Sequence, residues 1–540
     1  MPVVPIKQLG QLGVVTDIDP FDLPPNAFNF AVNARFANQK VSRSPVFRQV
    51  YETSVAEPRF ITRYGITTES ILVAHKNGTV RSFTGSTETD VTLAAYVPST
   101  AETPYTAANL SNVLYLNRED RPPWYLGPAS SAFLNLTATG WGATWRTKVI
   151  RGFNSTVVAF NTTESGTTYP NRVRWSNFAL ANTPPADWDE TDPTSAAGIN
   201  ELAEMEGAIT DAQALRNAMI VYSGQETWLM EASGLDSIYN FRRLFLGKGA
   251  INANCSVEIA GKHYVFGADD IWVHDGISFE SIANGRVRQF IFSSINTAFS
   301  NRCFVTHNRN LNEVMFCYVS GDRGVSFSPS TREGCNRAAV FNYVDQTWSF
   351  VDLPFVYSAT MATVANTTTW ATAVGTWAAD GGSWLDEEDG FKKVTIFCGG
   401  ATGTLNDCFY AYDLYGTGSI ANFAVTEDAN PAMFLERVGI DLDQLEAFME
   451  LRGYKVVKSI YPQGRVPSDG EVMYFTFGGA DYWDVGADYS AAQSFDGDEF
   501  YKLDFMAEGR VLSYTCSYDD YRDASLSSLD VDVVLTGRGP

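Results

Sequence analysis

Apolar and polar residues alternate in short runs along most of the chain, and the runs end at Gly, Asn, Asp or Pro. Val, Ile, Thr, Tyr, Phe and Trp dominate these runs, which is typical of β-strands. Residues 71–83 and 262–282 predict successive antiparallel strands, with Asn77-Gly78 and Asp275-Gly276 at reversing turns. The chain is therefore predicted to be all-β.

A longer repeat combines an apolar strand, a short polar turn and a second strand with a central aromatic residue. The marker aromatics are Phe83, Trp124, Trp175, Trp228, Trp272 and Trp348, separated by 41, 51, 53, 44 and 76 residues. A period of about 40–50 residues is typical of a β-propeller, in which each unit is one four-stranded blade. We expect about six blades, within a range of five to seven. An array of β-sandwiches remains an alternative.

Two details of this repeat can be checked in a structure. Trp124, Trp228 and Trp272 should be buried at equivalent places in successive blades, where they fill the space between neighbouring sheets. The longest gap between markers contains strand-like runs at 303–307 and 312–319. It therefore holds either a long loop or an additional blade.

Changes in pattern divide the chain into three parts. Residues 1–54 are rich in Pro and Asn and predict an extended arm with one hairpin, which makes assembly contacts. Residues 55–425 carry the repeat and predict the propeller. Residues 426–540 predict a C-terminal β domain resembling a sandwich, with a platform or docking role. In its last strand Leu529, Val531 and Val533 should face one side, and Asp530 and Asp532 the other.

Three segments show helical spacing of apolar residues. Residues 199–216 predict a helical insertion within one blade, and residues 286–298 and 435–451 predict two further helices.

The predicted N-terminal arm has too little core to fold alone. Its apolar residues Phe21, Leu23, Phe28 and Phe30 are expected to need an external surface.

Motifs of known catalytic chemistry do not occur in the sequence. It lacks a nucleophile elbow, a P-loop and a dinucleotide-binding turn, so we predict no catalytic residue and no cofactor. The string YVDQTWSF at 343–350 partly matches the Asp box of sialidase propellers, which is a blade turn without chemistry. The protein is therefore predicted not to be an enzyme.

The spacing of the histidines and cysteines predicts neither a metal site nor a set of disulfides. The four histidines lack metal-ligand spacing, so we predict no metal site; they are His75, His263, His274 and His307. The cysteines are odd in number and widely spaced, which predicts reduced, buried thiols; they are Cys255, Cys303, Cys317, Cys335, Cys398, Cys408 and Cys516.

The charge of the chain limits its partners. With 62 acidic and 39 basic residues the net charge is −23, so the protein will not hold DNA or RNA by neutralising phosphates.

Apolar runs stay below about 18 residues, which predicts no membrane-spanning segment. The N-terminal residues lack the pattern of a secretory signal, so synthesis in a cytoplasm is expected.

The N-terminal string GVVTDIDPFDLPPNAFNFAVNARFANQKVSRSPVF resembles the start of the tail nozzle proteins of short-tailed bacteriophages, also called tail tubular protein B or tail hub. The matching pattern consists of Asp17, Asp19, Leu23, Pro24, Pro25, Phe28, Asn33, Arg35 and Phe36, followed by Lys40 and Arg43. Residues 264–292 and 475–518 resemble the same family, so the resemblance spans most of the chain.

The resemblance implies a structural protein of the virion tail. It implies a homo-hexameric ring below the portal and adaptor proteins, with a propeller in each subunit and a platform for tail fibres. It also implies a central channel through which double-stranded DNA leaves the capsid without specific binding. We expect the channel wall to be mainly acidic or neutral, because basic side chains would trap passing phosphates. Candidate wall segments are Asp269-Asp270, Glu387-Glu388-Asp389 and Asp519-Asp520.

Two other functions remain open at this stage. One is a propeller-type tail protein that binds a host receptor or glycan. The other is a propeller glycosidase, which would need two facing carboxylates about 5–10 Å apart.

Overall fold

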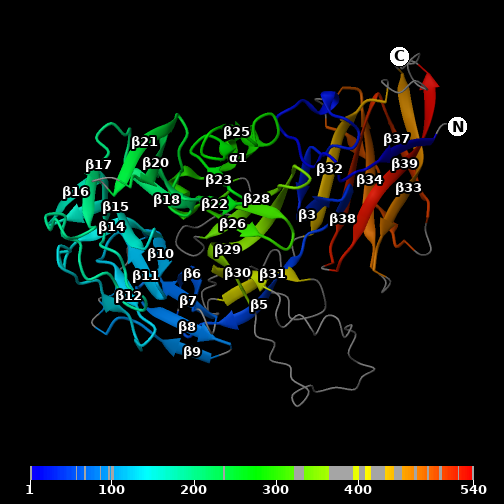
Figure 1. Ribbon diagram of the computed structural model, residues 1–540. Coiled ribbons are helices and arrows are strands. Elements are labelled where there is room, and N and C mark those ends of the chain that lie inside the picture. The colour runs from blue at the N-terminus through cyan, green and yellow to red at the C-terminus, as the bar shows by residue number, and fades with distance from the viewer. Residues whose placement is uncertain are drawn as a thin grey trace.

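We describe the protein from a computed structural model (Figure 1). The structure describes residues 3–55, 57–65, 69–85, 87–94, 96, 98, 102–234, 238–321, 334–363, 393–399, 408–414, 432–442, 453–467, 471–482, 486–497, 501–520 and 522–537. Nearly all regular structure in these residues is β-strand, which confirms the predicted all-β class.

Five consecutive four-stranded antiparallel sheets form the first part of the propeller. Sheet 1 contains β6 (Pro58–Tyr64), β7 (Ser70–His75), β8 (Val80–Thr84) and β9 (Thr87–Asp90). Sheet 2 contains β10 (Tyr105–Leu110), β11 (Val113–Arg118), β12 (Trp124–Leu126) and β13 (Leu134–Asn135). Sheet 3 contains β14 (Arg146–Phe153), β15 (Thr156–Glu164), β16 (Thr167–Trp175) and β17 (Gly198–Glu201).

The ring continues with two sheets of the same design. Sheet 4 contains β18 (Ile209–Leu215), β19 (Ala218–Ser223), β20 (Glu226–Ala232) and β21 (Tyr239–Leu246). Sheet 5 contains β22 (Ser256–Ile259), β23 (Lys262–Phe266), β24 (Ile271–His274) and β25 (Phe279–Ser281). The predicted turns of two hairpins are confirmed, with Gly78 at φ +97° and Gly276 at φ +87°.

The long strand β29 (Thr347–Thr363) belongs to two sheets at once. Its first half is the fourth strand of sheet 6, after β26 (Phe304–Asn308), β27 (Glu313–Tyr318) and β28 (Cys335–Asn342). Its second half is the first strand of sheet 7, which continues with β30 (Lys393–Gly399) and β31 (Cys408–Leu414). Phe355, at φ +54°, marks the change between the two halves.

Sheet 7 is completed by β5 (Val46–Glu52), which comes from the N-terminal side of the propeller and pairs with β31. The first strand of each sheet contacts the first strand of the next, and β29 contacts β6, so the seven sheets form a closed ring (Figure 1). The ring has one blade more than the six we expected. The additional blade lies beyond the last marker aromatic and takes its strands from both ends of the propeller sequence.

The marker aromatics occupy the predicted places. Trp124, Trp228 and Trp272 lie on the third strands of sheets 2, 4 and 5, and all three are buried. Phe83 and Trp175 hold the same position in sheets 1 and 3. Trp348 differs because it lies on the fourth strand of sheet 6, which explains the longer final gap. That gap contains β26, β27 and β28, which are the first three strands of sheet 6, so its strand-like runs belong to the blade that Trp348 itself marks and not to an additional one.

The predicted helix at 199–216 is wrong. This segment forms the end of β17, a connecting turn and β18. Leu202, Met205 and Ile209 are buried at helical spacing because a turn, with Gly207 at φ +79°, lies between the two strands. The sequence pattern therefore combined buried positions from three different local structures.

The other helical predictions have mixed outcomes. Residues 286–298 contain the short helix α1 (Arg288–Ser294), followed by a 3-10 helix at Thr297–Arg302. In the segment 435–451, residues up to Ile440 belong to β32 (Met433–Ile440), which contradicts the predicted helix there. Residues 443–451 lie outside the described residues.

The C-terminal strands form a β-sandwich. One sheet has β3 (Ala34–Ala37), β4 (Lys40–Arg43), β39 (Ser525–Gly537), β33 (Tyr454–Arg465) and β37 (Leu503–Gly509), and β1 (Val3–Lys7) also pairs with β39. The other has β2 (Phe30–Val32), β32, β38 (Val511–Tyr518) and β34 (Met473–Ala480), with the short strands β35 (Asp488–Tyr489) and β36 (Gln493–Phe495) at its edge. In β39, Leu529, Val531 and Val533 are buried and Asp530 and Asp532 are not, as the alternation predicted.

The N-terminal segment is not a separate arm. Its strands contribute to both sandwich sheets and to sheet 7, and Leu23 and Phe28 are buried within the same chain. The buried guanidinium of Arg437 on β32 donates hydrogen bonds to the carbonyl oxygens of Pro20 (3.0 Å) and Leu23 (2.8 Å). The apolar residues of this segment therefore find their surface inside the subunit, which corrects the expectation that they need an external one.

This arrangement predicts that residues 1–54 are required for the propeller to close. Their removal deletes β5, which leaves β31 as an open edge and sheet 7 one strand short. We expect the truncated chain to lose cooperative thermal unfolding, measured by circular dichroism, and to become sensitive to protease. Removal of residues 1–8 deletes only β1, which pairs with β39 in the sandwich, and should leave the propeller intact. A folded, protease-resistant propeller without residues 1–54 would contradict the prediction.

Candidate functional site

The first strands of all seven sheets line a cavity on the propeller axis. Its volume is about 240 Å³, and its wall includes Ala107 of β10, Arg151 of β14, Gln213 of β18 and Val305 of β26. Ligand pockets in proteins usually measure roughly 300–1,000 Å³. The cavity is therefore small for an organic ligand, and it is far too narrow for a DNA duplex, whose major groove alone is about 12 Å wide.

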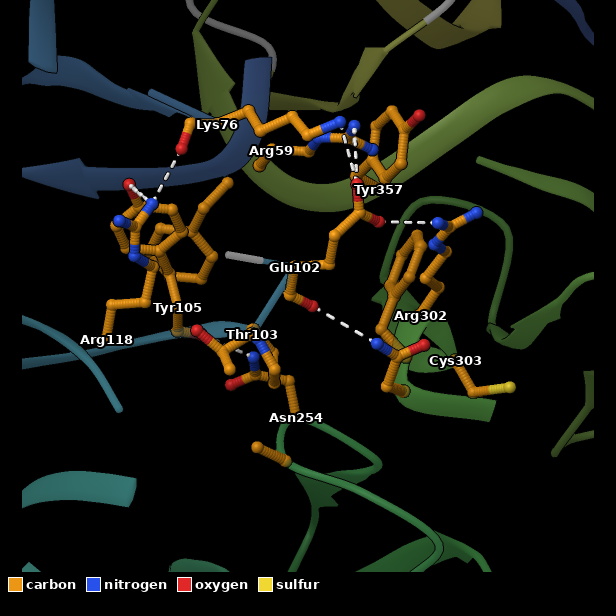
Figure 2. Close-up of a pocket in the computed structure, with 15 residues that line it drawn as sticks. Arg59, Lys76, Glu102, Thr103, Tyr105, Arg118, Asn254, Arg302, Cys303 and Tyr357 are labelled. Carbon is orange, nitrogen blue, oxygen red and sulfur yellow. Dashed lines mark hydrogen bonds and ion pairs between the residues drawn. The ribbon is translucent and has the colours of Figure 1, made fainter. Parts of the chain in front are cut away.

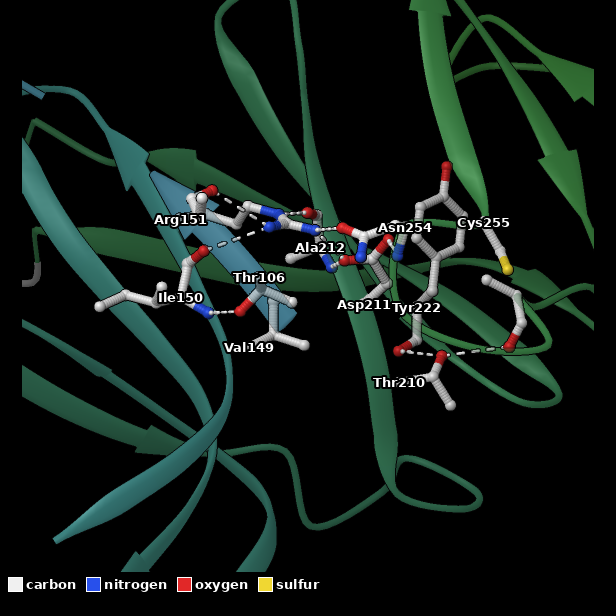
Figure 3. A network of polar contacts seen from close by, with 12 residues as sticks. Thr106, Val149, Ile150, Arg151, Thr210, Asp211, Ala212, Tyr222, Asn254 and Cys255 are labelled. Carbon is white, nitrogen blue, oxygen red and sulfur yellow. Dashed lines mark hydrogen bonds and ion pairs between the residues drawn. The ribbon is translucent and has the colours of Figure 1, made fainter. Parts of the chain in front are cut away.

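Arg151 of sheet 3 links sheets 2 and 4 and the connection before β22 at this axis (Figure 3). Its Nη2 lies 2.7 Å from Oδ1 of Asp211, and its Nε donates to the carbonyl of Ala212 at 2.7 Å. The same guanidinium donates to the carbonyl of Ala107 at 3.3 Å and to Oδ1 of Asn254, before β22, at 3.2 Å. The ion pair of Arg151 and Asp211, together with these hydrogen bonds, therefore connects sheets 2, 3 and 4 and the residues before β22 across the axial cavity.

Asp211 is the deepest ionisable group of this network. Its side chain is 1 % exposed, and burial raises the pKa of its carboxyl group despite the opposing charge of Arg151 and hydrogen bonds from the main chain. Asn254 supports the carboxylate, because its main-chain N–H donates to Asp211 Oδ2 at 2.9 Å. An ionised Asp211 therefore depends on Arg151.

A second, smaller cavity of about 50 Å³ adjoins the first, with which it shares Phe60, Asn254, Phe304 and Tyr357. Glu102 lies in this cavity, and cationic side chains surround it (Figure 2). Burial alone would raise the pKa of Glu102, but the hydrogen bond from Lys76 and the charges of Arg59 and Arg302 hold that pKa at about 2. The carboxylate is thus ionised at neutral pH.

Three buried aromatic residues join sheets 4 and 5 away from the axis. The hydroxyl of Tyr222 lies 2.7 Å from Nδ1 of His263 and 2.7 Å from Nε2 of His274. His263 Nε2 contacts the carbonyl of Ala214 at 2.9 Å, and the main-chain N–H of Gly276 donates to His274 Nδ1 at 3.2 Å. One arrangement satisfies every group: His274 donates to Tyr222, Tyr222 to His263, and His263 to Ala214. Both imidazoles are neutral in this arrangement.

The four histidines and six of the cysteines serve packing in the structure. Each histidine lies on a strand, and among the described residues no group of His, Cys, Asp or Glu has the geometry to hold a metal ion. The cysteines whose side chains the structure describes are buried, and burial raises the pKa of Cys317, for example, well above its usual value. No helix in the described ranges is long and apolar enough to cross a membrane.

The acidic segments expected to line a channel have different environments. Asp270 is buried and paired with Lys248 at 2.8 Å, so it cannot face a channel, whereas its neighbour Asp269 is 72 % exposed. Asp519 is exposed. Residues 387–389 lie outside the described residues. Sequence reasoning missed the Arg151 and Tyr222 networks, because the partners of Arg151 and Tyr222 lie 41 to 103 residues away from them and share no local motif.

The axial ion pair should matter more than a surface pair. Replacing Arg151 with Met leaves the Asp211 carboxylate buried without its cation, which should lower the free energy of unfolding by about 3–5 kcal/mol. Adding Asp211→Asn removes the charge and should restore part of this loss. Arg242→Met is the control, because Arg242 is 59 % exposed, lies 3.7 Å from Glu231 and should cost about 1 kcal/mol or less. Equal losses in urea denaturation for the two single variants would contradict the prediction.

The histidine network predicts loss of stability in acid. Burial lowers the pKa of His263 to about 4 and, together with the charge of His263, that of His274 to about 3. In the unfolded chain both titrate near 6.5, so the unfolded state binds more protons and stability falls as the pH drops from about 6.5 to 4. Each histidine contributes up to about 1.4 kcal/mol per pH unit. His274→Gln keeps a donor for Tyr222 but does not titrate, so it should flatten the dependence; an unchanged slope in urea denaturation would refute the assignment.

The chain is similar to several solved structures, at low sequence identity. No family model matches the sequence, and no curated protein matches it. One of these solved structures is the designed protein Ika8, with 8 % sequence identity, a TM-score of 0.35 and coverage of 68 % of this chain and 100 % of that chain. Another is the WD40 β-propeller domain of Doa1, with 8 % identity, a TM-score of 0.38 and coverage of 70 % of this chain and 99 % of that chain. A third is YCF48 bound to a peptide, with 11 % identity, a TM-score of 0.31 and coverage of 56 % of this chain and 86 % of that chain. The β-propeller assignment itself rests on the closed ring of sheets in this chain.

Proposed function

We propose that the protein is a structural nozzle of a short-tailed bacteriophage. In this proposal six copies form a ring below the portal and adaptor proteins, conduct double-stranded DNA during ejection and provide a platform for tail fibres. The protein acts as part of the virion tail after its synthesis in the host cytoplasm, and it catalyses no reaction. The resemblance of residues 13–47 to tail nozzle proteins is the origin of the proposal.

The observation that carries it is the position of the resembling residues. They lie where the propeller meets the sandwich, and they make specific contacts there. The carboxylate of Asp17 accepts hydrogen bonds from the main-chain N–H of Gln289 in α1, at 3.1 and 3.2 Å. Arg35 forms a 2.6 Å ion pair with Glu313 of sheet 6. Buried Arg43 donates to the carbonyl of Asn33 at 2.9 Å.

These contacts give the N-terminal pattern a structural meaning. Asp17 and Arg35 are polar residues whose partners Gln289 and Glu313 lie far away in the sequence, so this part of the pattern encodes how the two parts of the subunit are joined. A pattern of this kind supports a shared architecture, because each residue is constrained by a contact rather than by local propensity.

The axial cavity bears on the route of the DNA. Because a cavity of about 240 Å³ cannot admit a duplex, DNA does not pass through the propeller of one subunit. In a nozzle the channel then lies between subunits, on the axis of the ring. The net charge of −23 per chain suits such a channel, since an acidic wall repels phosphates and does not retain them.

The test is electron microscopy of the purified full-length chain over a range of concentrations. We expect rings of six subunits, with a central pore wide enough for a DNA duplex and a wall poor in exposed Lys and Arg. Rings are expected to bind DNA weakly at low salt, in contrast to a DNA-gripping protein. A monomer at every concentration, or a monomer that binds a host glycan tightly on an array, would overturn the proposal.

A further inference from the structure

The carboxylate of Glu102 is the meeting point of cations from different parts of the propeller (Figure 2). Nζ of Lys76, in the turn after β7, lies 2.7 Å from Oε1. Nη2 of Arg302, which ends the 3-10 helix before β26, lies 2.5 Å from Oε2, and Nη2 of Arg59 in β6 lies 3.9 Å from Oε1. The three cationic groups therefore surround a single oxyanion in the small cavity that adjoins the axial one.

The two arginines are held in place by contacts other than Glu102. The guanidinium of Arg59 lies over the ring of Tyr357, 4.0 Å from its centroid, and that of Arg302 lies over Phe299 at 4.3 Å. Cation–π contacts of this kind fix both the position and the plane of a guanidinium. The arrangement of donors should thus persist when the Glu102 carboxylate is absent.

Glu102 itself belongs to the connection between β9 and β10, outside any strand. Its side chain is 31 % exposed, against 9 % for Arg302 and 12 % for Arg59. The acid is therefore the least enclosed member of the cluster. The adjoining cavity of about 50 Å³ has room for a few water-sized groups, since one water needs about 10–15 Å³ by the same measure.

We propose that this cluster is a phosphate-binding site, in which an inorganic phosphate ion replaces the Glu102 carboxylate as the partner of Arg59, Lys76 and Arg302. Phosphate offers more acceptor oxygens than a carboxylate and a charge of about −1.5 to −2 at neutral pH. Arginine and lysine together are the side chains that bind such ions in proteins. The small cavity excludes the phosphates of duplex DNA, so the ligand is a free ion.

In this proposal Glu102 is an internal competitor of the ligand. While its carboxylate occupies the donors, phosphate must displace it, so the wild-type chain binds phosphate weakly. Substitution Glu102→Gln removes the competing charge but keeps the length of the side chain. Phosphate should then bind about tenfold more tightly or better, with one ion per chain. The proposal is independent of the nozzle function, because it depends only on the geometry within one subunit.

The experiment is calorimetric titration of the full-length chain with sodium phosphate, at neutral pH and constant ionic strength. Glu57→Gln is the matched control, because Glu57 lies 3.8 Å from Lys76 and is 48 % exposed, so it is a more distant and more exposed carboxylate than Glu102. Its variant should bind phosphate like the wild type. Sulfate, similar in shape and charge, should compete, and chloride should not.

The melting temperature is a second measurement, which tests the proposal even if a variant folds poorly. Glu102→Gln should melt at a lower temperature than wild type in chloride, and phosphate should raise its melting temperature in a saturable manner. Adding Arg302→Gln should abolish that rescue. If Glu102→Gln shows no binding heat and melts at the same temperature in phosphate and chloride, or if rescue survives Arg302→Gln, the cluster is only a structural ion-pair network and the proposal fails.

Discussion

The double pairing of β2 is the interaction on which the architecture depends. Val32 of this short strand pairs in parallel with Phe350 of β29, and the strand as a whole pairs antiparallel with β32. The next residue, Asn33, donates its main-chain N–H to Phe350 at 2.7 Å and its side-chain amide to the carbonyl of Ala432 at 3.0 Å. Its Oδ1 accepts from the main-chain N–H of Asp352 at 3.0 Å. One residue thus satisfies backbone groups of the propeller and of the sandwich.

Because of this pairing, the blade and the sandwich share one continuous sheet and one core. Phe30 lies with its ring centroid 6.3 Å from those of Phe350 and Phe434, which belong to the two different parts. Domains of one chain usually meet in modest, polar interfaces that permit relative motion. Here a rotation between the parts would break ladder hydrogen bonds and expose aromatic surface. The subunit should therefore behave as one body, which is compatible with the proposed ring.

The sequence predicted those features that depend on local spacing. The strands, the tight turns and the aromatic marker of each blade follow from patterns within about 20 residues, and they are confirmed at Trp124, Trp228 and Trp272. The seventh blade and the role of residues 1–54 depend on the pairing of β5 with β31, which lies more than 350 residues away in the chain. No local pattern reports such a pairing. The same limit applies to the site, because Glu102 and Arg302 are 200 residues apart.

The axis of the propeller shows why long-range ion pairs gather there. The first strands of seven sheets surround a hollow that no single apolar side chain can fill, whereas an arginine can reach across it and donate several hydrogen bonds. Arg151 with Asp211 joins two neighbouring sheets, and Arg302 with Glu102 joins the connections that precede sheets 6 and 2. Such pairs add little net stability compared with apolar packing, but they are costly to break. They therefore oppose separation of neighbouring blades in a ring that non-covalent contacts hold closed, among them the pairing of β5 with β31.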